Sequence, residues 1–142
     1  MSDPTELYKQ AVVEHSKHPR NEGPLPEATA EATTVNPLCG DKVTVRAVVE
    51  DGRLVTLRFE GRGCAIAMAS ASMMAELLEG QSVEEALQTA TTLAAVVAGE
   101  QDGPNDPQHP IARLRGVRAF PARRRCATLA WETLTQAVSP SG

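Results

Sequence analysis

Two alternating runs joined by a tight turn constrain the fold of this chain more than any other feature of its sequence. In residues 43–49 an apolar side chain recurs at every second position, and residues 55–59 repeat the pattern with Val55 on the apolar face. Such alternation is typical of a half-buried β-strand, whose side chains point to opposite faces in turn. The dipeptide Asp51-Gly52 between the runs favours a two-residue turn. The sequence therefore predicts an antiparallel hairpin with one apolar face.

Helical patterns follow the hairpin and supply a layer that covers this face. Residues 64–80 are apolar nearly all round and rich in small side chains, which is typical of a helix buried against a sheet. A weaker strand pattern precedes the hairpin at residues 30–35. Further helices are expected over residues 3–19, 82–99 and 122–138, with loops at "GEQDGPNDPQHP" and "GVRAFP". The whole pattern predicts an α+β fold, a small antiparallel sheet with helices packed on it.

Length, charge and cysteine count narrow the class of protein. With 142 residues the chain is long enough for one domain with a modest core. Its net charge of -4 argues against nucleic acid as the main partner. No apolar run is long enough to span a bilayer and the N-terminus is polar, so we expect no membrane segment and no signal peptide. The 3 widely spaced cysteines argue against a disulfide framework and for a reducing, cytoplasmic compartment.

The cysteines stand at the ends of the expected elements, and one of them has a carboxylate beside it. Cys39 comes two residues before Asp41, and residues i and i+2 of an extended segment point to the same side. Cys64 begins the expected buried helix, whose N-terminal partial charge favours a thiolate. Cys126 lies in the first turns of the last helix, directly after three arginines that also favour a thiolate. These four residues form a candidate set of ligands.

Three thiolates and one carboxylate would make a closed tetrahedral set of the kind that zinc prefers. Iron in a cluster is the main competitor for the same donors. Spacing does not decide between them, because the sequence contains no CxxC pair, and unrelated buried cysteines remain a third interpretation. We interpret His15, His18 and His109 as structural or solvated residues rather than as ligands.

Positive charge is unevenly distributed along the chain. Residues 63–112 contain neither Lys nor Arg, whereas residues 113–125 contain six arginines. This cluster is interpreted either as a solvated rim or as a docking face for an acidic partner surface, and the sequence leaves both interpretations open.

Four segments resemble the U-type iron–sulfur cluster assembly proteins, and most of all their SufU type. They are "LYKQAVVEHSKHPRN", "NPLCGD", "GRGCAIAMASASMM" and "FPARRRCATLAWETL", and the resemblance runs from Leu7 to about Val138. The family implies a three-stranded antiparallel sheet with helices on one side, the SufE/NifU-like fold, over a single domain of residues 1–142. It also implies a metal site at one end of the molecule.

The same resemblance implies roles for individual residues. Cys39, Asp41, Cys64 and Cys126 would bind Zn²⁺, and Cys39 would be the catalytic residue that accepts sulfur. Arg123 matches a basic position of the family near the site and would support it.

Two departures from the IscU type favour the SufU branch of the family. The IscU type has a histidine immediately before the third cysteine, and this chain has Arg125 there. The segment from about Leu87 to Pro107 is also longer, as in the SufU type. The resemblance therefore implies a zinc-dependent sulfurtransferase that accepts persulfide sulfur from a cysteine desulfurase of the SufS type for iron–sulfur cluster assembly, with a downstream cluster scaffold as a further partner. The alternatives are a scaffold on which a [2Fe–2S] cluster is assembled and transferred, and a domain with inert cysteines.

Overall fold

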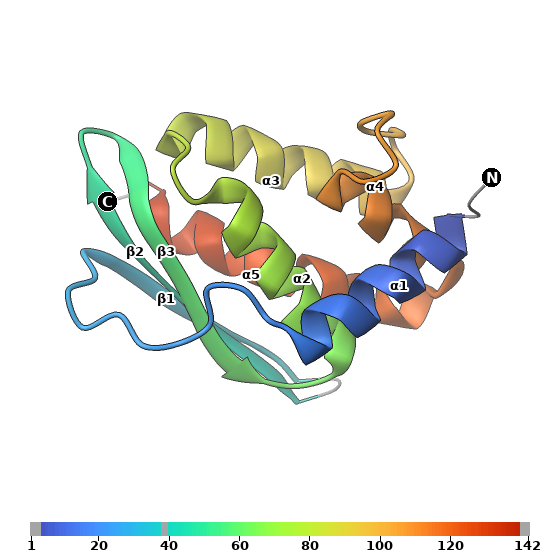
Figure 1. The fold of residues 1–142 in the computed structure, drawn as a ribbon, viewed down its shortest axis with the longest axis horizontal. Helices are drawn as coiled ribbons and strands as arrows, with labels where there is room; N and C mark the ends of the chain where they lie inside the picture. Colours follow the sequence, from blue (N-terminus) through green and yellow to red (C-terminus); the bar gives the residue numbers. More distant parts are fainter. Residues whose placement is uncertain (1–3, 38–39, 140–142) are drawn as a thin grey trace.

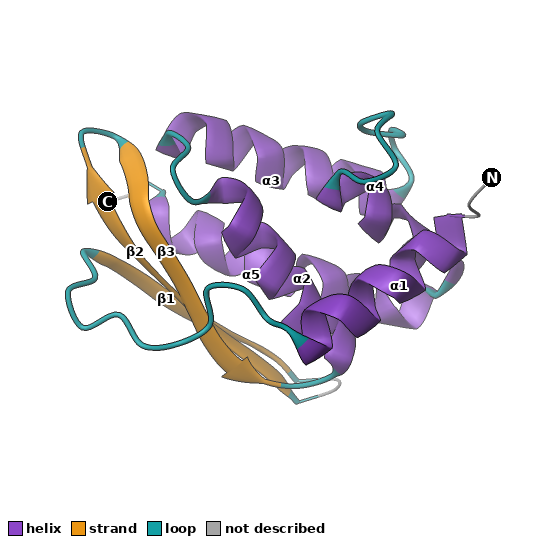
Figure 2. Ribbon diagram, in the orientation of Figure 1, coloured by secondary structure: helices purple, strands orange, loops and turns teal. Residues whose placement is uncertain are grey.

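The computed structural model describes residues 4–37 and 40–139, which form a three-stranded antiparallel sheet with helices on one side (Figures 1 and 2). The strands lie in the order β1-β2-β3 and span Ala30–Asn36, Asp41–Glu50 and Arg53–Arg62. The α-helices are α1 (Pro4–Lys17), α2 (Ala65–Leu78), α3 (Val83–Ala98), α4 (Pro110–Leu114) and α5 (Arg124–Val138). Two 3-10 turns, η1 (Arg115–Ala119) and η2 (Pro121–Arg123), join α4 to α5. The α+β fold predicted from the sequence is confirmed.

The hairpin forms where the alternation predicts it, with one correction to its register. Asp51 and Gly52 have φ of 51° and 76°, the positive values that a tight hairpin turn requires at both central positions. A β-bulge then shifts the pairing between Val48 and Val49. The bulge turns Val55 outward, where it is 48% exposed, and turns Leu54 into the core. The prediction that Val55 faces the core is therefore wrong.

The core is an aliphatic layer between the sheet and two long helices. Helix α5 packs on β1 and β2, and α2 packs on β3 and on α5. The small residues of α2 allow this close approach, and the helix is buried along most of its length as its composition predicts. Helix α3 begins at a capping box of Ser82 and Glu85 and ends at Gly99, in agreement with the sequence.

Two buried serines of α2 tie the neighbouring helices to it. The Ser70 hydroxyl donates to the carbonyl of Ala127 at 2.6 Å and accepts from Nε1 of Trp131 at 2.8 Å. Trp131 is 1% exposed, and this partner satisfies its buried indole N–H. Ser72 accepts from the backbone N–H of Arg20 at 2.7 Å, and its hydroxyl is also hydrogen-bonded to Nδ1 of His15 at 2.7 Å.

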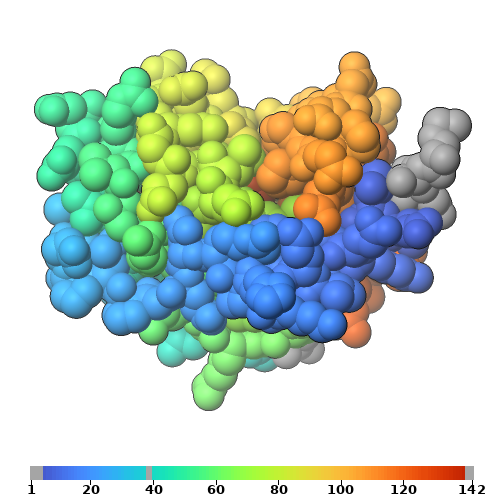
Figure 3. Space-filling model, viewed as in Figure 1, coloured from blue at the N-terminus to red at the C-terminus, as the bar shows by residue number. Residues whose placement is uncertain are grey.

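Helix α1 and the segment after it connect the helices to the sheet, because α1 pairs with α4 and the segment bonds to strands β2 and β3. They form a continuous blue band across the face shown in Figure 3. Burial lowers the pKa of His15, which faces Ser72 as a neutral ring, so this histidine is structural as expected. Glu14 pairs with Arg113 of α4 at 3.0 Å, which fixes α4 against α1.

The segment before α5 is more helical than the sequence predicts. "GVRAFP" forms part of the turns η1 and η2 instead of an open loop, and α4 precedes it. His109 caps α4 through Nδ1, which accepts from the N–H of Ile111 at 3.1 Å, and Pro110 occupies the first turn. This cap gives His109 the structural role expected for it. Among the described residues, none of the helices combines the length and apolar character needed to cross a bilayer.

We predict that Ser70→Ala lowers the free energy of unfolding by about 1–3 kcal/mol, because it leaves the buried indole N–H of Trp131 without an acceptor. Urea denaturation measures this loss. Thr89→Ala removes an exposed hydroxyl that bonds only within its own helix, and it should change stability by less than about 0.5 kcal/mol. Equal denaturation midpoints for Ser70→Ala and the unchanged protein would contradict the prediction.

Candidate metal centre

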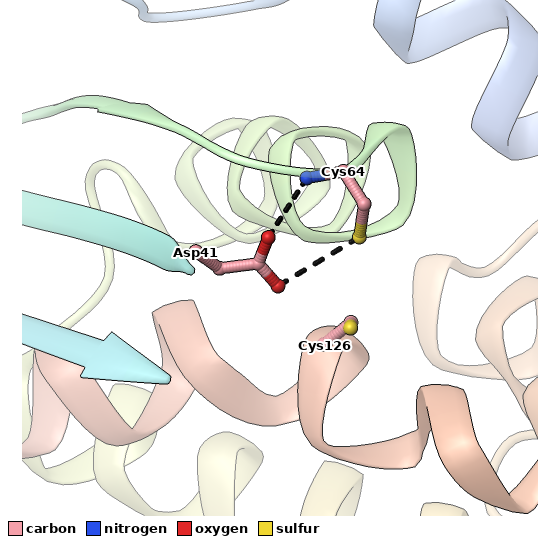
Figure 4. A group of neighbouring side chains, drawn as sticks. All are labelled: Asp41, Cys64 and Cys126. Atoms are coloured by element: carbon pink, nitrogen blue, oxygen red, sulfur yellow. Dashed lines mark hydrogen bonds between the residues drawn. The ribbon is translucent and has the colours of Figure 1, made fainter. Parts of the chain in front are cut away.

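Three of the four residues selected from the sequence meet at one point of the structure. One ligand atom from each of Asp41, Cys64 and Cys126 lies within 4.8 Å of the other two (Figure 4). They come from the start of β2, the N-cap of α2 and the first turn of α5. Asp41 is fully buried, Cys126 is 1% exposed and Cys64 is half-buried. The group thus lies at one end of the sheet, at the boundary between core and surface.

The register of the hairpin places Asp41 beside Cys64. Lys42 pairs with Arg62, so the first residue of β2 lies next to the residues that leave β3 for α2. The Asp41 carboxylate accepts from the backbone N–H of Cys64 through Oδ1 at 2.8 Å, and its Oδ2 lies 3.7 Å from Sγ of Cys64. Asp41 therefore satisfies a free N–H group at the start of α2 while it faces the thiol.

Glycine is required at the position between β3 and Cys64. A Cβ atom on Gly63 would come within 2.8 Å of Cγ and 3.0 Å of Cα of Asp41, and closer still to Oδ1. Any larger residue would therefore displace the carboxylate from Cys64. The glycine that the sequence places beside the cysteine serves this close approach.

The third member of the group is brought in by the packing of α5 on α2. Cys126 directly precedes Ala127, whose carbonyl accepts from Ser70 at 2.6 Å. This bond holds the first turn of α5 against the helix that begins at Cys64. The N-termini of both helices therefore converge on the group, and their partial positive charges favour anionic ligands there.

The six arginines divide into an inward set and an outward set. The inward side chains bond within the protein: Arg113 to Glu14, Arg115 to the Pro104 carbonyl, Arg118 to the Val96 carbonyl and Arg124 to the Arg118 carbonyl. Arg123 and Arg125 are exposed, and Arg125 pairs with Glu132 at 3.0 Å. Of the six arginines, these two, which both shortly precede Cys126 in the sequence, offer charge to a partner on this side of the molecule.

Tyr8 is a neighbour of the group that the sequence did not reveal. Its side chain is 3% exposed. Burial, and then the nearby sulfurs of Cys64 and Cys126, raise the pKa of Tyr8 to about 12, against the opposing charge of Arg123. No local pattern could have indicated this, because Tyr8 and Cys64 lie on different helices.

The remaining predicted ligand, Cys39, lies outside the described residues, so its place in the site stays a prediction. Within the described ranges, the group includes none of the three histidines, as expected. The donors present fit a metal ion: two thiols and a carboxylate are ligands of tetrahedral zinc, with bonds of about 2.3 Å to sulfur and about 2.0–2.2 Å to oxygen. The same donors also suit iron.

Comparisons with known proteins place this chain in a family. Residues 7–140 match the family model described as the NifU-like N terminal domain. The chain is 36% identical over 133 residues to the zinc-dependent sulfurtransferase SufU of Bacillus subtilis, covering 94% of this chain and 90% of that protein. It is also 36% identical over 135 residues to the iron–sulfur cluster assembly scaffold protein IscU of Streptococcus pyogenes, covering 95% of this chain and 84% of that protein.

Solved structures show the same fold. A crystal structure from Fervidobacterium islandicum, described as a candidate iron–sulfur cluster assembly scaffold protein for the SUF system, superposes with a TM-score of 0.85. It is 30% identical to this chain, and the match covers 92% of this chain and 96% of that one.

We predict that Asp41→Ala weakens zinc binding at least about tenfold, because even the loss of a residue that only supports a ligand typically costs that much. Transfer of zinc to a coloured chelator measures the change. Asp41→Asn keeps an acceptor for the Cys64 N–H and should preserve the fold better while still binding zinc more weakly. The control is Asp102→Asn, because the side chain of Asp102 is 89% exposed. This variant should bind zinc normally. Unchanged zinc retention in Asp41→Ala would exclude Asp41 as a ligand.

Proposed function

The chain belongs to the family of NifU-like N-terminal domains, and from this membership we propose that it is a zinc-dependent sulfurtransferase that accepts persulfide sulfur from a cysteine desulfurase for iron–sulfur cluster assembly. The observation that carries the proposal is the buried group of Asp41, Cys64 and Cys126. The Bacillus relative, whose name states zinc dependence and sulfur transfer, supports it because the match extends over 94% of this chain.

Three of the proposed ligands are held by secondary structure. Asp41 begins a paired strand and accepts the N–H of Cys64, and Cys64 in turn accepts from the N–H of Ala67 through its sulfur at 3.4 Å. Cys126 lies in the first turn of α5, which Ser70 anchors to α2. Zinc bound among these donors would keep a ligating thiol in the thiolate form, the form that attacks a persulfide.

Cys39 is the proposed fourth ligand and the proposed sulfur acceptor. In the sequence it stands between Pro37 and Gly40, in the connection from β1 to β2. Release of Cys64 or Cys126 from the centre would disturb a helix start, and residues of connections in general move more easily than residues of helices. This difference supports Cys39 as the thiol that leaves the centre to react.

The transfer step is a thiolate attack on the outer sulfur of the desulfurase persulfide. A new S–S bond forms between the Cys39 thiolate and that sulfur as the existing S–S bond breaks, and the desulfurase cysteine leaves as a thiolate. One S–S bond replaces another and the transferred sulfur keeps its oxidation state, so no external oxidant or reductant is needed. The product is a persulfide on Cys39.

A scaffold that assembles a [2Fe–2S] cluster is the second candidate function. The observation that favours it is the donor set, which suits iron as well as zinc, and the Streptococcus relative is named as such a scaffold. Arg125 argues against the scaffold function, because proteins of the IscU type have a histidine immediately before the third cysteine, where this chain has Arg125. Protein purified with labile sulfide and visible absorbance would support the scaffold, and colourless protein with one zinc per chain would support the sulfurtransferase.

We predict that incubation with cysteine and a SufS-type cysteine desulfurase places the added sulfur on the peptide that contains "NPLCGD". Alkylation followed by peptide mass analysis locates it. Cys39→Ser should abolish the stimulation of desulfurase turnover, because the serine hydroxyl is not a nucleophile toward persulfide at neutral pH. Persulfide found mainly on Cys64 or Cys126 would contradict the assignment and leave Cys39 as a metal ligand alone.

We also propose that the exposed Arg123 and Arg125 guide the desulfurase to the centre, and we predict that its affinity falls with ionic strength. Raising salt from about 0.1 M to 1 M shortens the screening length from roughly 10 Å to 3 Å. Arg123→Glu should lower the association rate and flatten the salt dependence. Arg53→Glu, at the opposite end of β3, is the charge-matched control and should associate normally. Affinity that stays constant across this range would exclude electrostatic guidance.

A further inference from the structure

The hydroxyl of Tyr8 is buried beside the metal centre without a hydrogen-bond partner among the described residues. A buried polar group without a partner destabilises the folded state, since it loses its bonds to water and gains none in return. Phenylalanine would fill the same space without this cost. Stability of the fold therefore does not explain why this position has a tyrosine and not a phenylalanine.

The ring of Tyr8 contacts two residues that lie close in sequence to residues of the centre. It packs against Phe120, which precedes η2, with ring centroids 5.9 Å apart. It also lines an apolar hollow of about 350 Å³ with Ile66, two residues after Cys64. Tyr8 thus lies between the segments that carry Cys64 and Arg123, with its side chain 3% exposed.

The hydroxyl is a neutral donor in this position. A phenol keeps its proton at neutral pH, so the hydroxyl can donate one hydrogen bond. The structure gives it no bond to either sulfur. Among the described residues it therefore has no acceptor, and an atom that joins the centre can accept this bond.

We propose, on the basis of the function proposed above, that the Tyr8 hydroxyl donates a hydrogen bond to the sulfur atom that arrives from the desulfurase persulfide. During the transfer this outer sulfur passes from the desulfurase cysteine to the accepting thiolate, and the S–S bond on one side forms as the other breaks. A donor aimed at the arriving sulfur holds it in line for attack. It also stabilises the negative charge that the attacking, transferred and leaving sulfurs share during the step. Tyr8 would thus be a substrate-binding residue of the reaction.

The variant Tyr8→Phe removes only the O–H group and keeps the ring against Phe120. We expect its melting temperature to equal or exceed that of the unchanged protein, its zinc content to stay the same, and the rate of sulfur acceptance to fall about ten- to hundredfold, as for a lost bond to a charged acceptor. Thr34→Val is the matched control, because Thr34 Oγ1 is another buried hydroxyl without a partner in the described part of the chain. It lies on β1 outside the ligand group, so this variant should accept sulfur at the normal rate.

A spectroscopic measurement tests the contact itself. Tyr8 is the only tyrosine of the chain, so protein made with 3-fluorotyrosine carries a single ¹⁹F signal. We expect this signal to shift when zinc-loaded protein is converted to the persulfide form, and to return when a reductant removes the sulfur. The measurement does not depend on how Tyr8→Phe folds.

The outcomes separate this inference from the function on which it rests. An unchanged protein that accepts no sulfur overturns both. Normal sulfur acceptance by the unchanged protein with an equal rate in Tyr8→Phe, or a ¹⁹F signal that does not move on persulfide loading, overturns the role of Tyr8 alone. An equal slowing in Thr34→Val would show a general effect of removing a buried hydroxyl and would also overturn it.

Discussion

The buried carboxylate of Asp41 is the constraint on which the rest of the site depends. It begins β2, accepts the N–H group at the start of α2 and faces the thiols of Cys64 and Cys126. A fully buried carboxylate is costly unless hydrogen bonds or positive charge compensate it. Here the N-termini of α2 and α5 supply part of that compensation, and a bound cation would supply more. The geometry of the fold and the chemistry of the site are therefore one arrangement.

Around this carboxylate the protein combines rigid parts with parts that are open to a partner. Ser70 fixes α5 to α2 from within the core, and Gly63 leaves the space that Asp41 needs. Near the two sulfurs lie Tyr8, which is buried but has no partner in the described residues, and Arg123, which is exposed. The proposed sulfur transfer needs this combination, because a bound metal would have to stay in place while the substrate sulfur enters and leaves.

The arginines show how a charge cluster in sequence can divide between two tasks. Among the helical turns before α5 and its first residue, Arg113 bonds to α1, Arg115 to the loop after α3, Arg118 to the last turn of α3, and Arg124 to η1. These bonds fix the segment that leads into Cys126. The solvated-rim interpretation and the docking interpretation were alternatives at the level of sequence, and the structure leaves only Arg123 and Arg125 available for docking.

The sequence by itself determined the elements and the candidate ligands. Alternation, the Asp51-Gly52 turn and the capping box at Ser82 each depend on residues close together in the chain, so a local pattern predicts them well. The cysteine motifs likewise indicate Asp41, Cys64 and Cys126 as candidate ligands, and these three residues lie together in the structure. What only the tertiary structure decided was the β-bulge that turns Val55 outward, the burial of Trp131 and the place of Tyr8. Each of these follows from contacts between separate elements. Ser70, for example, bonds to Ala127 and Trp131, which lie 57 and 61 positions further along the chain, and a local sequence pattern does not indicate such contacts.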